Sequence, residues 1–257
     1  MKLTLALGFL FTAAIYASVG FGGGSTYTAL LAISGIAYTA IPIVSLVCNI
    51  CVVTSNSWRY LRGGFIKLSQ VWPLFALSVP AAMLGGLLNV SEVFFIGLLS
   101  VALLIAGLRL LFSQPESEDT LGLRVNRKPV LSGILGGIIG FYSGIVGIGG
   151  GIFLAPILYR LRWGRAQTIA ATCSFFILVN SLAGLSGQLI KLNGSDDSLN
   201  IVSYWPLILA VIIGGTLGNS LSLRAFNPQH LRRITGVLIL LVAIRISLKW
   251  LCLMTEI

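Results

Sequence analysis

The chain has 257 residues, of which 56% are hydrophobic and 9% are charged, and its mean hydropathy is +0.98. About a quarter of the residues of an ordinary soluble domain are charged, so this composition excludes a soluble globular protein and predicts a polytopic α-helical membrane protein. The formal charge of +10 does not indicate a nucleic-acid partner, because the basic residues lie in short connections between apolar runs, where they set the orientation of a membrane protein.

The apolar runs predict two series of five helical segments. The first series lies at about 3–20, 24–37, 40–58, 68–89 and 92–112. The second series lies at about 130–147, 151–161, 166–190, 200–222 and 230–252. At about 1.5 Å per residue, the second segment of each series is too short for a hydrocarbon core about 30 Å thick. We therefore expect a broken or re-entrant helix there, and roughly 8–10 spans in all.

Four short matches in the same order indicate an internal repeat. The matching pairs are Gly20–Gly24 with Gly147–Gly151, Asn56-Ser57 with Asn180-Ser181, Trp72-Pro73 with Trp205-Pro206, and Leu84-Gly85 with Leu217-Gly218. Their offsets drift between 124 and 133 residues, which is typical of an old duplication with loop insertions. We therefore expect a first transmembrane repeat over residues 1–113, a cytoplasmic linker over 114–129 and a second transmembrane repeat over 130–257.

The basic residues predict opposite orientations for the two halves. Five crossings per half, with 58–67, 109–128, 160–165 and 224–233 in the cytoplasm, put 13 of the 17 Lys and Arg residues inside. Eight spans and parallel halves would instead move the last two of these groups outside. The positive-inside rule therefore favours inverted repeats with both termini outside. A hairpin in which the first and the short segment both turn back at mid-membrane has the same parity.

The two glycine turns are the first candidate for a binding site. Inverted repeats with a broken helix in each half are typical of secondary transporters that hold their substrate near the midplane of the bilayer. Glycine lets the backbone approach another group closely, and the N–H groups at the start of the next helix attract anions. Close helix packing is the alternative role of such small residues. The candidate substrate-binding residues are Gly22, Gly23, Gly24, Ser25, Thr26, Gly149, Gly150 and Gly151.

Polar residues on the third segment of each half are the second candidate. Asn49 and Asn56 are seven residues apart and share one helix face, as do Cys173 and Asn180. An intramembrane amide is costly without a partner, and it can donate to an oxyanion. The alternative is that these side chains only tie two helices together. The candidates are Asn49, Asn56, Thr172, Cys173 and Asn180.

Several kinds of chemistry have no residues to support them. The seven acidic residues and the single histidine, His230, lie in predicted loops or near the ends of spans. A proton relay or cation site at mid-membrane is therefore not expected, and an anionic substrate is favoured. Cys48 and Cys51 have no His, Asp or third Cys nearby, so we expect neither a metal nor a cofactor. No catalytic motif appears, and we expect no enzyme activity.

The glycine turns and four other stretches resemble the TauE/SafE sulfite exporter family of bacterial and archaeal permeases. The resemblance covers nearly the whole chain. The stretches that carry it are Gly20–Ser25, Gly144–Gly151, Ala170–Ser174 together with Asn180-Ser181, Arg59–Gly64, and Pro80–Gly86.

The resemblance implies export of sulfite, organosulfonates or related sulfur oxyanions across the cytoplasmic (inner) membrane. The expected partners are thus a small sulfur oxyanion and the lipid bilayer, with no nucleic acid, and a homodimer is an open alternative to a monomer. The residues independently favour an anion, because their intramembrane binding groups are N–H, hydroxyl and amide donors. An importer of the same anions and a membrane scaffold that transports nothing are the alternatives.

Overall fold

The computed structural model describes residues 3–66, 68–112, 129–161, 163–193, 201–220 and 228–255. This part of the chain forms ten α-helices, one short 3₁₀ helix and no β-strand, which confirms the predicted all-α class. Most of the proposed linker over 114–129 lies outside the described residues. The elements are α1 (Leu3–Val19), α2 (Gly24–Ile33), α3 (Ala40–Arg62), α4 (Leu68–Leu87), α5 (Glu92–Phe112), α6 (Pro129–Val146), α7 (Gly151–Arg160), α8 (Ala166–Asn193), η1 (Ile201–Tyr204), α9 (Trp205–Ser220) and α10 (Pro228–Thr255).

The two short helices start directly after the glycine turns. Helices α2 and α7 have ten residues each, so each extends about 15 Å, half of a hydrocarbon core about 30 Å thick. The residue before each helix is a glycine with a left-handed backbone, Gly23 at φ 82° and Gly150 at φ 78°. Residues with a Cβ avoid this region, so glycine is needed for the chain to turn there.

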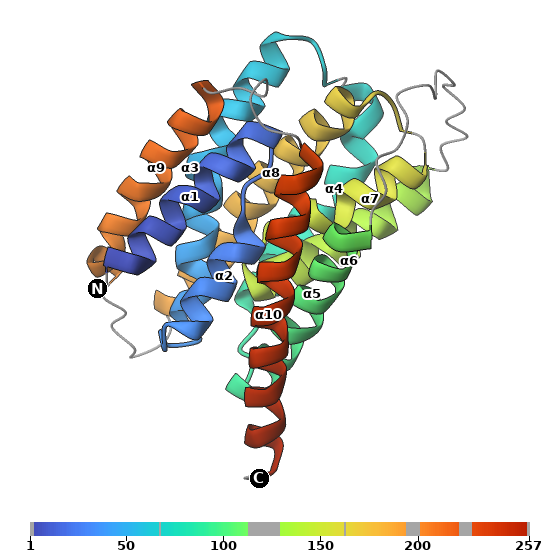
Figure 1. Cartoon of the computed structure of the whole chain (residues 1–257). Helices are drawn as coiled ribbons and strands as arrows, with labels where there is room; N and C mark the ends of the chain where they lie inside the picture. The colour runs from blue at the N-terminus through green and yellow to red at the C-terminus, as the bar shows by residue number, and fades with distance from the viewer. Residues whose placement is uncertain are drawn as a thin grey trace.

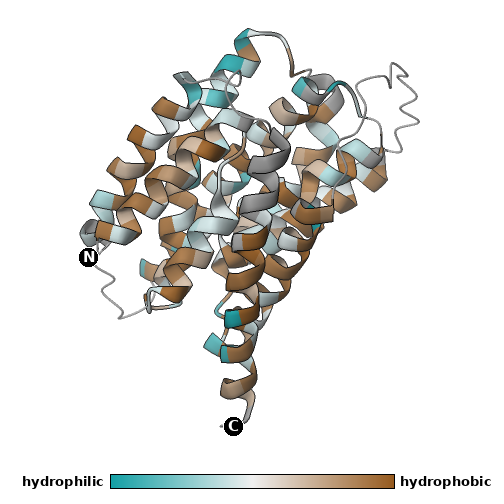
Figure 2. Ribbon diagram, in the orientation of Figure 1, coloured by the Kyte–Doolittle hydropathy of each residue, from teal (hydrophilic) through white to brown (hydrophobic). Residues whose placement is uncertain are grey.

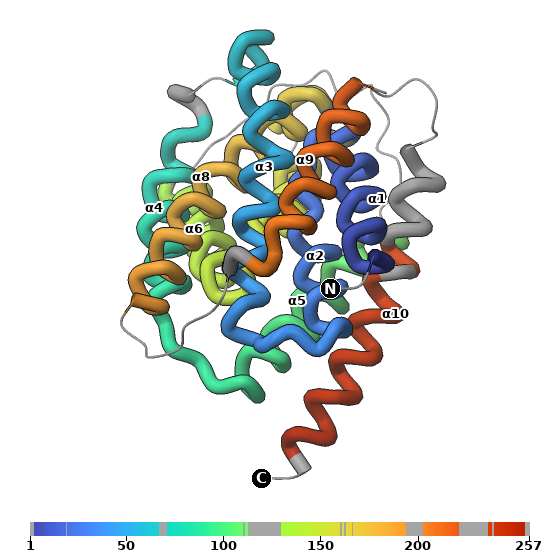
Figure 3. Tube along the Cα trace, turned by 90° about the vertical axis from the view of Figure 1, so that its left-hand side faces the viewer, coloured from blue at the N-terminus to red at the C-terminus, as the bar shows by residue number. Residues whose placement is uncertain are grey.

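The short helix α2 follows a turn at which the chain reverses direction. In Figure 1, α1 rises from the lower end of the bundle, α2 descends again after the turn, and α3 then crosses to the upper end. Helices α4 and α10 descend, whereas α5 and α9 rise, and α8 descends where α3 rises; Figure 3 gives the same directions for α3, α4, α8, α9 and α10. The third, fourth and fifth helices of one half thus run opposite to their counterparts in the other half.

The helix contacts recur when the helices of the two halves are exchanged. Helix α1 packs against α9 as α6 packs against α4, and α3 contacts α9 as α8 contacts α4. Helix α2 contacts α10 as α7 contacts α5, while α3 pairs with α8 and α5 with α10. Each half therefore packs mainly on the other half rather than on itself.

Glycines allow the closest of these contacts. A Cβ added to Gly85 of α4 would collide with the carbonyl oxygen of Phe141 in α6, and a Cβ added to Gly218 of α9 would collide with that of Ala14 in α1. Gly85 and Gly218 belong to matching sequence pairs, and Ala14 precedes Phe141 by 127 residues, which is the offset between the glycine turns. Small residues let membrane helices approach one another in this way.

The outer surface of the bundle is apolar. Hydrophobic residues dominate along the helices, and hydrophilic residues gather near helix ends, as at the upper end of α3 (Figure 2). Large exposed side chains include Phe11, Trp72 and Leu241. Within the described residues, α3, α5 and α8 are individually long and apolar enough to cross a membrane. The structure is therefore that of a helical membrane protein, while the total number of spans stays a prediction.

Candidate functional site

The two glycine turns meet inside the bundle, although 127 residues separate them in sequence. A Cβ added to Gly24 would collide with the carbonyl oxygen of Ile148 and with the side chain of Asn49. A Cβ added to Gly149 would lie 2.9 Å from Asn49 Nδ2, and one added to Gly22 would lie 2.5 Å from Asn49 Oδ1. Asn49 therefore stands where the two turns approach each other.

Two side chains of α3 hold the second turn in place. Ser45 Oγ donates a hydrogen bond to the carbonyl oxygen of Gly147 at 2.8 Å, and it also lies 3.3 Å from the carbonyl oxygen of Gly24. Asn49 Nδ2 donates to the carbonyl oxygen of Ile148 at 3.2 Å. Ser45 and Asn49 are four residues apart, so they share one face of the helix, and both are fully buried. A helix of the first half thus binds the turn of the second half.

Several carbonyl groups of the turns accept hydrogen bonds, whereas most of the N–H groups of the turns have no acceptor in the described part of the chain. Besides the bonds from α3, the carbonyl oxygens of Gly23 and Gly150 accept from the first turns of α2 and α7. Among the described residues, none accepts a hydrogen bond from the N–H groups of 22–25 or 148–152. Buried backbone groups are nearly always paired, so these N–H groups are available to a ligand that accepts hydrogen bonds. The positive ends of the dipoles of α2 and α7 lie at the same turns and also attract negative charge. The meeting point of the turns therefore favours a negatively charged ligand.

Two buried hydroxyl groups beside the turns also have no hydrogen-bond partner in the described part of the chain, Tyr27 Oη and Ser181 Oγ. A Cβ added to Gly149 would lie 3.2 Å from Ser181 Oγ, and a Cβ added to Gly23 would lie 3.2 Å from the hydroxyl oxygen of Tyr27. The ring of Tyr27 stacks on Phe9 with the ring centroids 4.8 Å apart, which fixes its direction. Each turn therefore has one free hydroxyl donor next to it.

The structure brings together only some of the residues predicted for the site. Gly22, Gly24, Gly149 and Asn49 lie around the meeting point of the turns. A Cβ on Gly23 or Gly150 would instead point at neighbouring side chains, so these two glycines serve the backbone conformation. Gly151 faces the side chain of Ile177.

The other predicted residues are buried but have partners elsewhere. Thr26 Oγ1 lies 3.1 Å from Tyr16 Oη, and Asn56 Nδ2 donates to the carbonyl oxygen of Ala17 at 3.2 Å, which ties α3 to the end of α1. Two residues of α8 donate to carbonyl oxygens one turn earlier in their own helix, Thr172 to Thr168 at 2.8 Å and Asn180 to Phe176 at 2.9 Å. Ser25 and Cys173 are also buried. The hydrogen bonds that these side chains make in the described structure do not join the two turns.

Ser45, Tyr27 and Ser181 were not among the predicted site residues. Ser45 precedes Asn49 by one helical turn, and Ser181 is the repeat counterpart of Ser57, so both could have been selected by their position on α3 and α8. The hydroxyl group of Tyr27 has no counterpart in the second half, where the equivalent residue is Leu154.

The described part of this region holds no charged side chain and no metal-binding cluster. No group of three or more His, Cys, Asp or Glu residues in the described ranges could hold a metal ion. Arg59 and Arg62 lie in the last turn of α3, and Lys191 lies in the last turn of α8. The described hydrogen-bond donors around the turns are therefore neutral groups.

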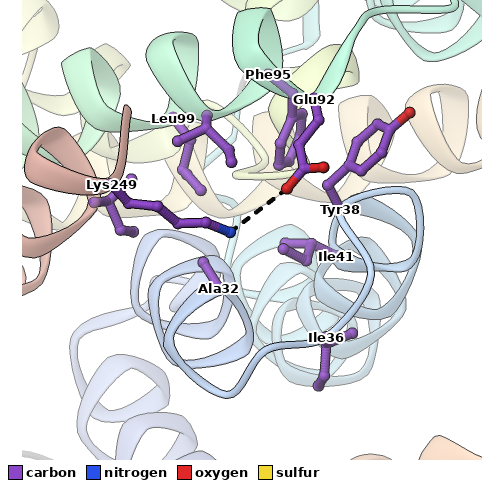
Figure 4. Close-up of a pocket in the computed structure, with 10 residues that line it drawn as sticks. Ala32, Ile36, Tyr38, Ile41, Glu92, Phe95, Leu99 and Lys249 are labelled. Atoms are coloured by element: carbon purple, nitrogen blue, oxygen red, sulfur yellow. Dashed lines mark hydrogen bonds and ion pairs between the residues drawn. The ribbon is translucent and has the colours of Figure 1, made fainter. Parts of the chain in front are cut away.

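A separate small cavity lies at the lower end of the bundle, between α2, α3, α5 and α10. Its volume is about 30 Å³, and its walls combine apolar side chains with the polar ones of Tyr38, Glu92 and Lys249. Figure 4 shows Lys249 of α10 reaching the carboxylate of Glu92 in α5, with Ala32 and Ile41 on the opposite side. The Lys249 Nζ to Glu92 Oε1 distance is 3.5 Å, and both side chains are about half exposed. This ion pair links α5 to α10 away from the glycine turns.

The chain has relatives of nearly the same length. It is 32% identical over 244 residues to the probable membrane transporter protein y4hK of Sinorhizobium fredii, which covers 94% of this chain and 96% of that protein. It is 26% identical over 263 residues to the probable membrane transporter protein YjnA of Bacillus subtilis, covering 96% and 100% respectively. No solved structure matches the chain.

The family model for the sulfite exporter TauE/SafE matches residues 5–246, a range that includes both glycine turns and all of the helices from α2 to α9. This match, together with the full-length similarity to y4hK, confirms the resemblance inferred from the sequence. The chain is a membrane transporter protein of the TauE/SafE sulfite exporter family.

Proposed function

We propose that the protein is a permease that exports sulfite, organosulfonates or related sulfur oxyanions across the cytoplasmic membrane, and that it holds the anion where the two glycine turns meet. The observation that carries this proposal is an imbalance in the turns. The carbonyl groups of Gly23, Gly24, Gly147, Ile148 and Gly150 accept hydrogen bonds, while the N–H groups of 22–25 and 148–152 have no acceptor among the described residues. An anion is the ligand that such a group of donors stabilises.

The proposal includes two inverted repeats, 1–113 and 130–257. The opposite helix directions support it (Figure 1), as do the helix contacts that recur when the halves are exchanged. The equivalent approaches of Gly85 to Phe141 and of Gly218 to Ala14 support it independently. In transporters built from inverted repeats, rocking of one repeat against the other exposes a central site to each side in turn.

Movement of the anion requires the turns to separate. Gly24 lies so close to Ile148 that even a Cβ would collide, and the Ser45–Gly147 and Asn49–Ile148 hydrogen bonds join the halves at this point. We propose that these two bonds form a latch, which opens and closes in each transport cycle. Their net stabilisation is about 0.5–1.5 kcal/mol each, small enough for repeated opening.

The distribution of basic residues supports a cytoplasmic location for the connections α3–α4, α5–α6, α7–α8 and α9–α10, since 13 of the 17 Lys and Arg residues fall there or at the adjoining helix ends. In this orientation a potential of about 100 mV, negative inside, drives each elementary negative charge outward with roughly 2.3 kcal/mol. Export of an anion therefore needs no proton relay through the protein.

Thermal unfolding of the purified protein in detergent tests the binding step. A transporter of sulfur oxyanions is stabilised by its ligand by RT ln(1 + [L]/Kd), so sulfite should raise Tm, whereas chloride at equal ionic strength controls for salt. A membrane scaffold predicts no difference between the two anions. An importer predicts the same stabilisation, and the direction of flux in proteoliposomes separates it from an exporter.

A further inference from the structure

The amide oxygen of Asn49 is a buried acceptor without a donor, and its environment bears on which form of the anion the proposed site takes. Asn49 is fully buried. Its Nδ2 donates to the carbonyl oxygen of Ile148. A carbonyl oxygen can accept a hydrogen bond from the amide nitrogen but not from the amide oxygen, so this bond defines which atom of the Asn49 amide is the oxygen. Asn49 Oδ1 then has no partner among the described residues. A buried acceptor left unpaired costs about as much as a lost hydrogen bond, which a ligand that donates would offset.

Ser181 supplies a free donor at the same place. Hydroxyl groups within the membrane helices of this chain commonly donate to a carbonyl oxygen one turn earlier, as Thr172 and Ser186 of the same helix do. Ser181 is fully buried, and its Oγ has no partner in the described structure. Its Oγ and Asn49 Nδ2 lie on the same side of Gly149, at 3.2 and 2.9 Å from the position of an added Cβ. A ligand beside Gly149 thus meets a hydroxyl donor as well as the Asn49 side chain.

Among the described side chains, no full positive charge stands near this point to balance a doubly charged ligand. The titratable side chains described on α1, α2, α3, α6, α7 and α8 are Tyr16, Tyr27, Cys48, Cys51, Arg59, Tyr60, Arg62, Tyr142, Tyr159, Cys173 and Lys191. Those with a positive charge lie in the last turn of α3 or α8. The Born cost of desolvation grows with the square of the charge, so a dianion costs roughly four times as much as a monoanion of the same size.

We propose that the site selects a singly charged oxyanion that still carries an O–H group, the hydrogensulfite form in the case of sulfite. The O–H group donates to Asn49 Oδ1, and the anionic oxygens accept from Ser181 Oγ and from the N–H groups of the turns. This inference rests on the proposed anion site and goes beyond it, because donors alone would accept any small anion.

The test compares sulfite with methanesulfonate in the purified full-length protein, over a pH series that brackets the second ionisation of sulfite. Methanesulfonate carries one charge throughout the series and has no O–H group. Above the second ionisation, the affinity for total sulfite should fall about tenfold per pH unit, since the bound form carries one more proton. The affinity for methanesulfonate should stay constant, which also controls for titration of the protein.

The outcomes separate the two proposals. If neither anion raises Tm at any pH, the proposed function is wrong. If both raise it and the affinity for sulfite does not change with pH, the anion site stands and the selection of a protonated anion is wrong. A parallel fall for both ligands would assign the pH dependence to the protein and would equally overturn the inference.

Two variants assign the roles within the site. Ser181→Ala should lower the affinities for sulfite and for methanesulfonate about tenfold each, which is the effect of losing one hydrogen bond to a charged group. The ratio of the two affinities should stay unchanged. Ser78→Ala is the matched control, because Ser78 is also fully buried with an unpaired Oγ but packs against Gly140 of α6; an equal loss in this variant would contradict the role of Ser181. Asn49→Leu should bring the affinities for sulfite and methanesulfonate at low pH close to each other. If folded Asn49→Leu protein still prefers sulfite over methanesulfonate, Asn49 is not the acceptor of the sulfite O–H group. If that variant does not fold, the pH series with the native protein decides the inference.

Discussion

Replacement of Gly24 by alanine tests whether the two turns meet as closely as the structure has them. Gly24 is the first residue of α2 and has no left-handed backbone, so alanine is compatible with its conformation and favours a helix by up to about 1 kcal/mol. The new methyl group would collide with the carbonyl oxygen of Ile148. Carbon–oxygen contacts lie at about 3.3–3.6 Å, so the turns must move apart by on the order of 1 Å.

This displacement should destabilise the protein. Overpacking of a buried contact costs about 1–3 kcal/mol, and loss of the Asn49–Ile148 bond adds about 0.5–1.5 kcal/mol. Each kcal/mol lowers Tm by about 2–4 °C in a chain of this size, so we expect a fall of roughly 3–18 °C, together with a smaller stabilisation by sulfite.

The assay is thermal unfolding in detergent with and without sulfite, and Gly137→Ala is the matched control. Gly137 is also helical, but a Cβ there would lie 3.5 Å from Leu77 Cβ, an ordinary contact. Its Tm should therefore be unchanged or slightly raised. If Gly24→Ala behaves like Gly137→Ala in both Tm and response to sulfite, the turns do not form the proposed contact.

Further predictions concern the backbone of the turns, the two asparagines of α3, the repeat and the ion pair. Gly23→Ala and Gly150→Ala should each lower Tm, because a left-handed alanine costs about 1–2 kcal/mol; an unchanged Tm in unfolding scans would contradict the φ values of 82° and 78°. Asn49→Leu should reduce the shift of Tm by sulfite at low pH to about that caused by methanesulfonate. Asn56→Leu, which breaks a bond to Ala17, should lower Tm and keep the full shift; equal behaviour would mean that both residues only tie helices. Gly85→Ala and Gly218→Ala should destabilise the protein to a similar degree. Gly215→Ala is the control, because the nearest atom to its new Cβ would be 3.7 Å away. A fall in Tm in only one of Gly85→Ala and Gly218→Ala would count against equivalent halves. The Glu92→Gln and Lys249→Met variants and their double mutant should show a coupling of about 0.2–1 kcal/mol, as for other exposed pairs; a larger coupling in the double-mutant cycle would show that the pair is more than a surface link.

The sequence predicted the local elements well because local signals determine them. The apolar runs gave the helices to within a few residues at most ends, and the repeated glycine triplets gave the two short helices and their turns. Glycine can adopt backbone conformations that are closed to other residues, and Gly23 and Gly150 do so with positive φ values.

The contacts between the halves could not be predicted in the same way. Sequence offsets relate the first turn to the second, but they do not say that Gly24 meets Ile148 or that Ser45 binds Gly147. The position of Ser181 in the repeat does not reveal that its hydroxyl lacks a partner, since a helical serine can always donate to its own helix, as Ser186 does. Asn180 makes such a bond to Phe176, although its repeat counterpart Asn56 bonds to another helix. The partner of an intramembrane polar residue therefore depends on packing that a single sequence does not encode locally.

The central claim is that a sulfur oxyanion crosses the membrane through the point where the glycine turns meet. Efflux of sulfite from proteoliposomes, with an imposed potential that is negative inside, measures this most directly. Native protein should release sulfite faster than protein-free liposomes, Asn49→Leu should reduce this flux to near the protein-free level, and Gly137→Ala should leave it unchanged. Sulfite efflux no faster than from protein-free liposomes, or efflux that Asn49→Leu does not alter, would contradict the account.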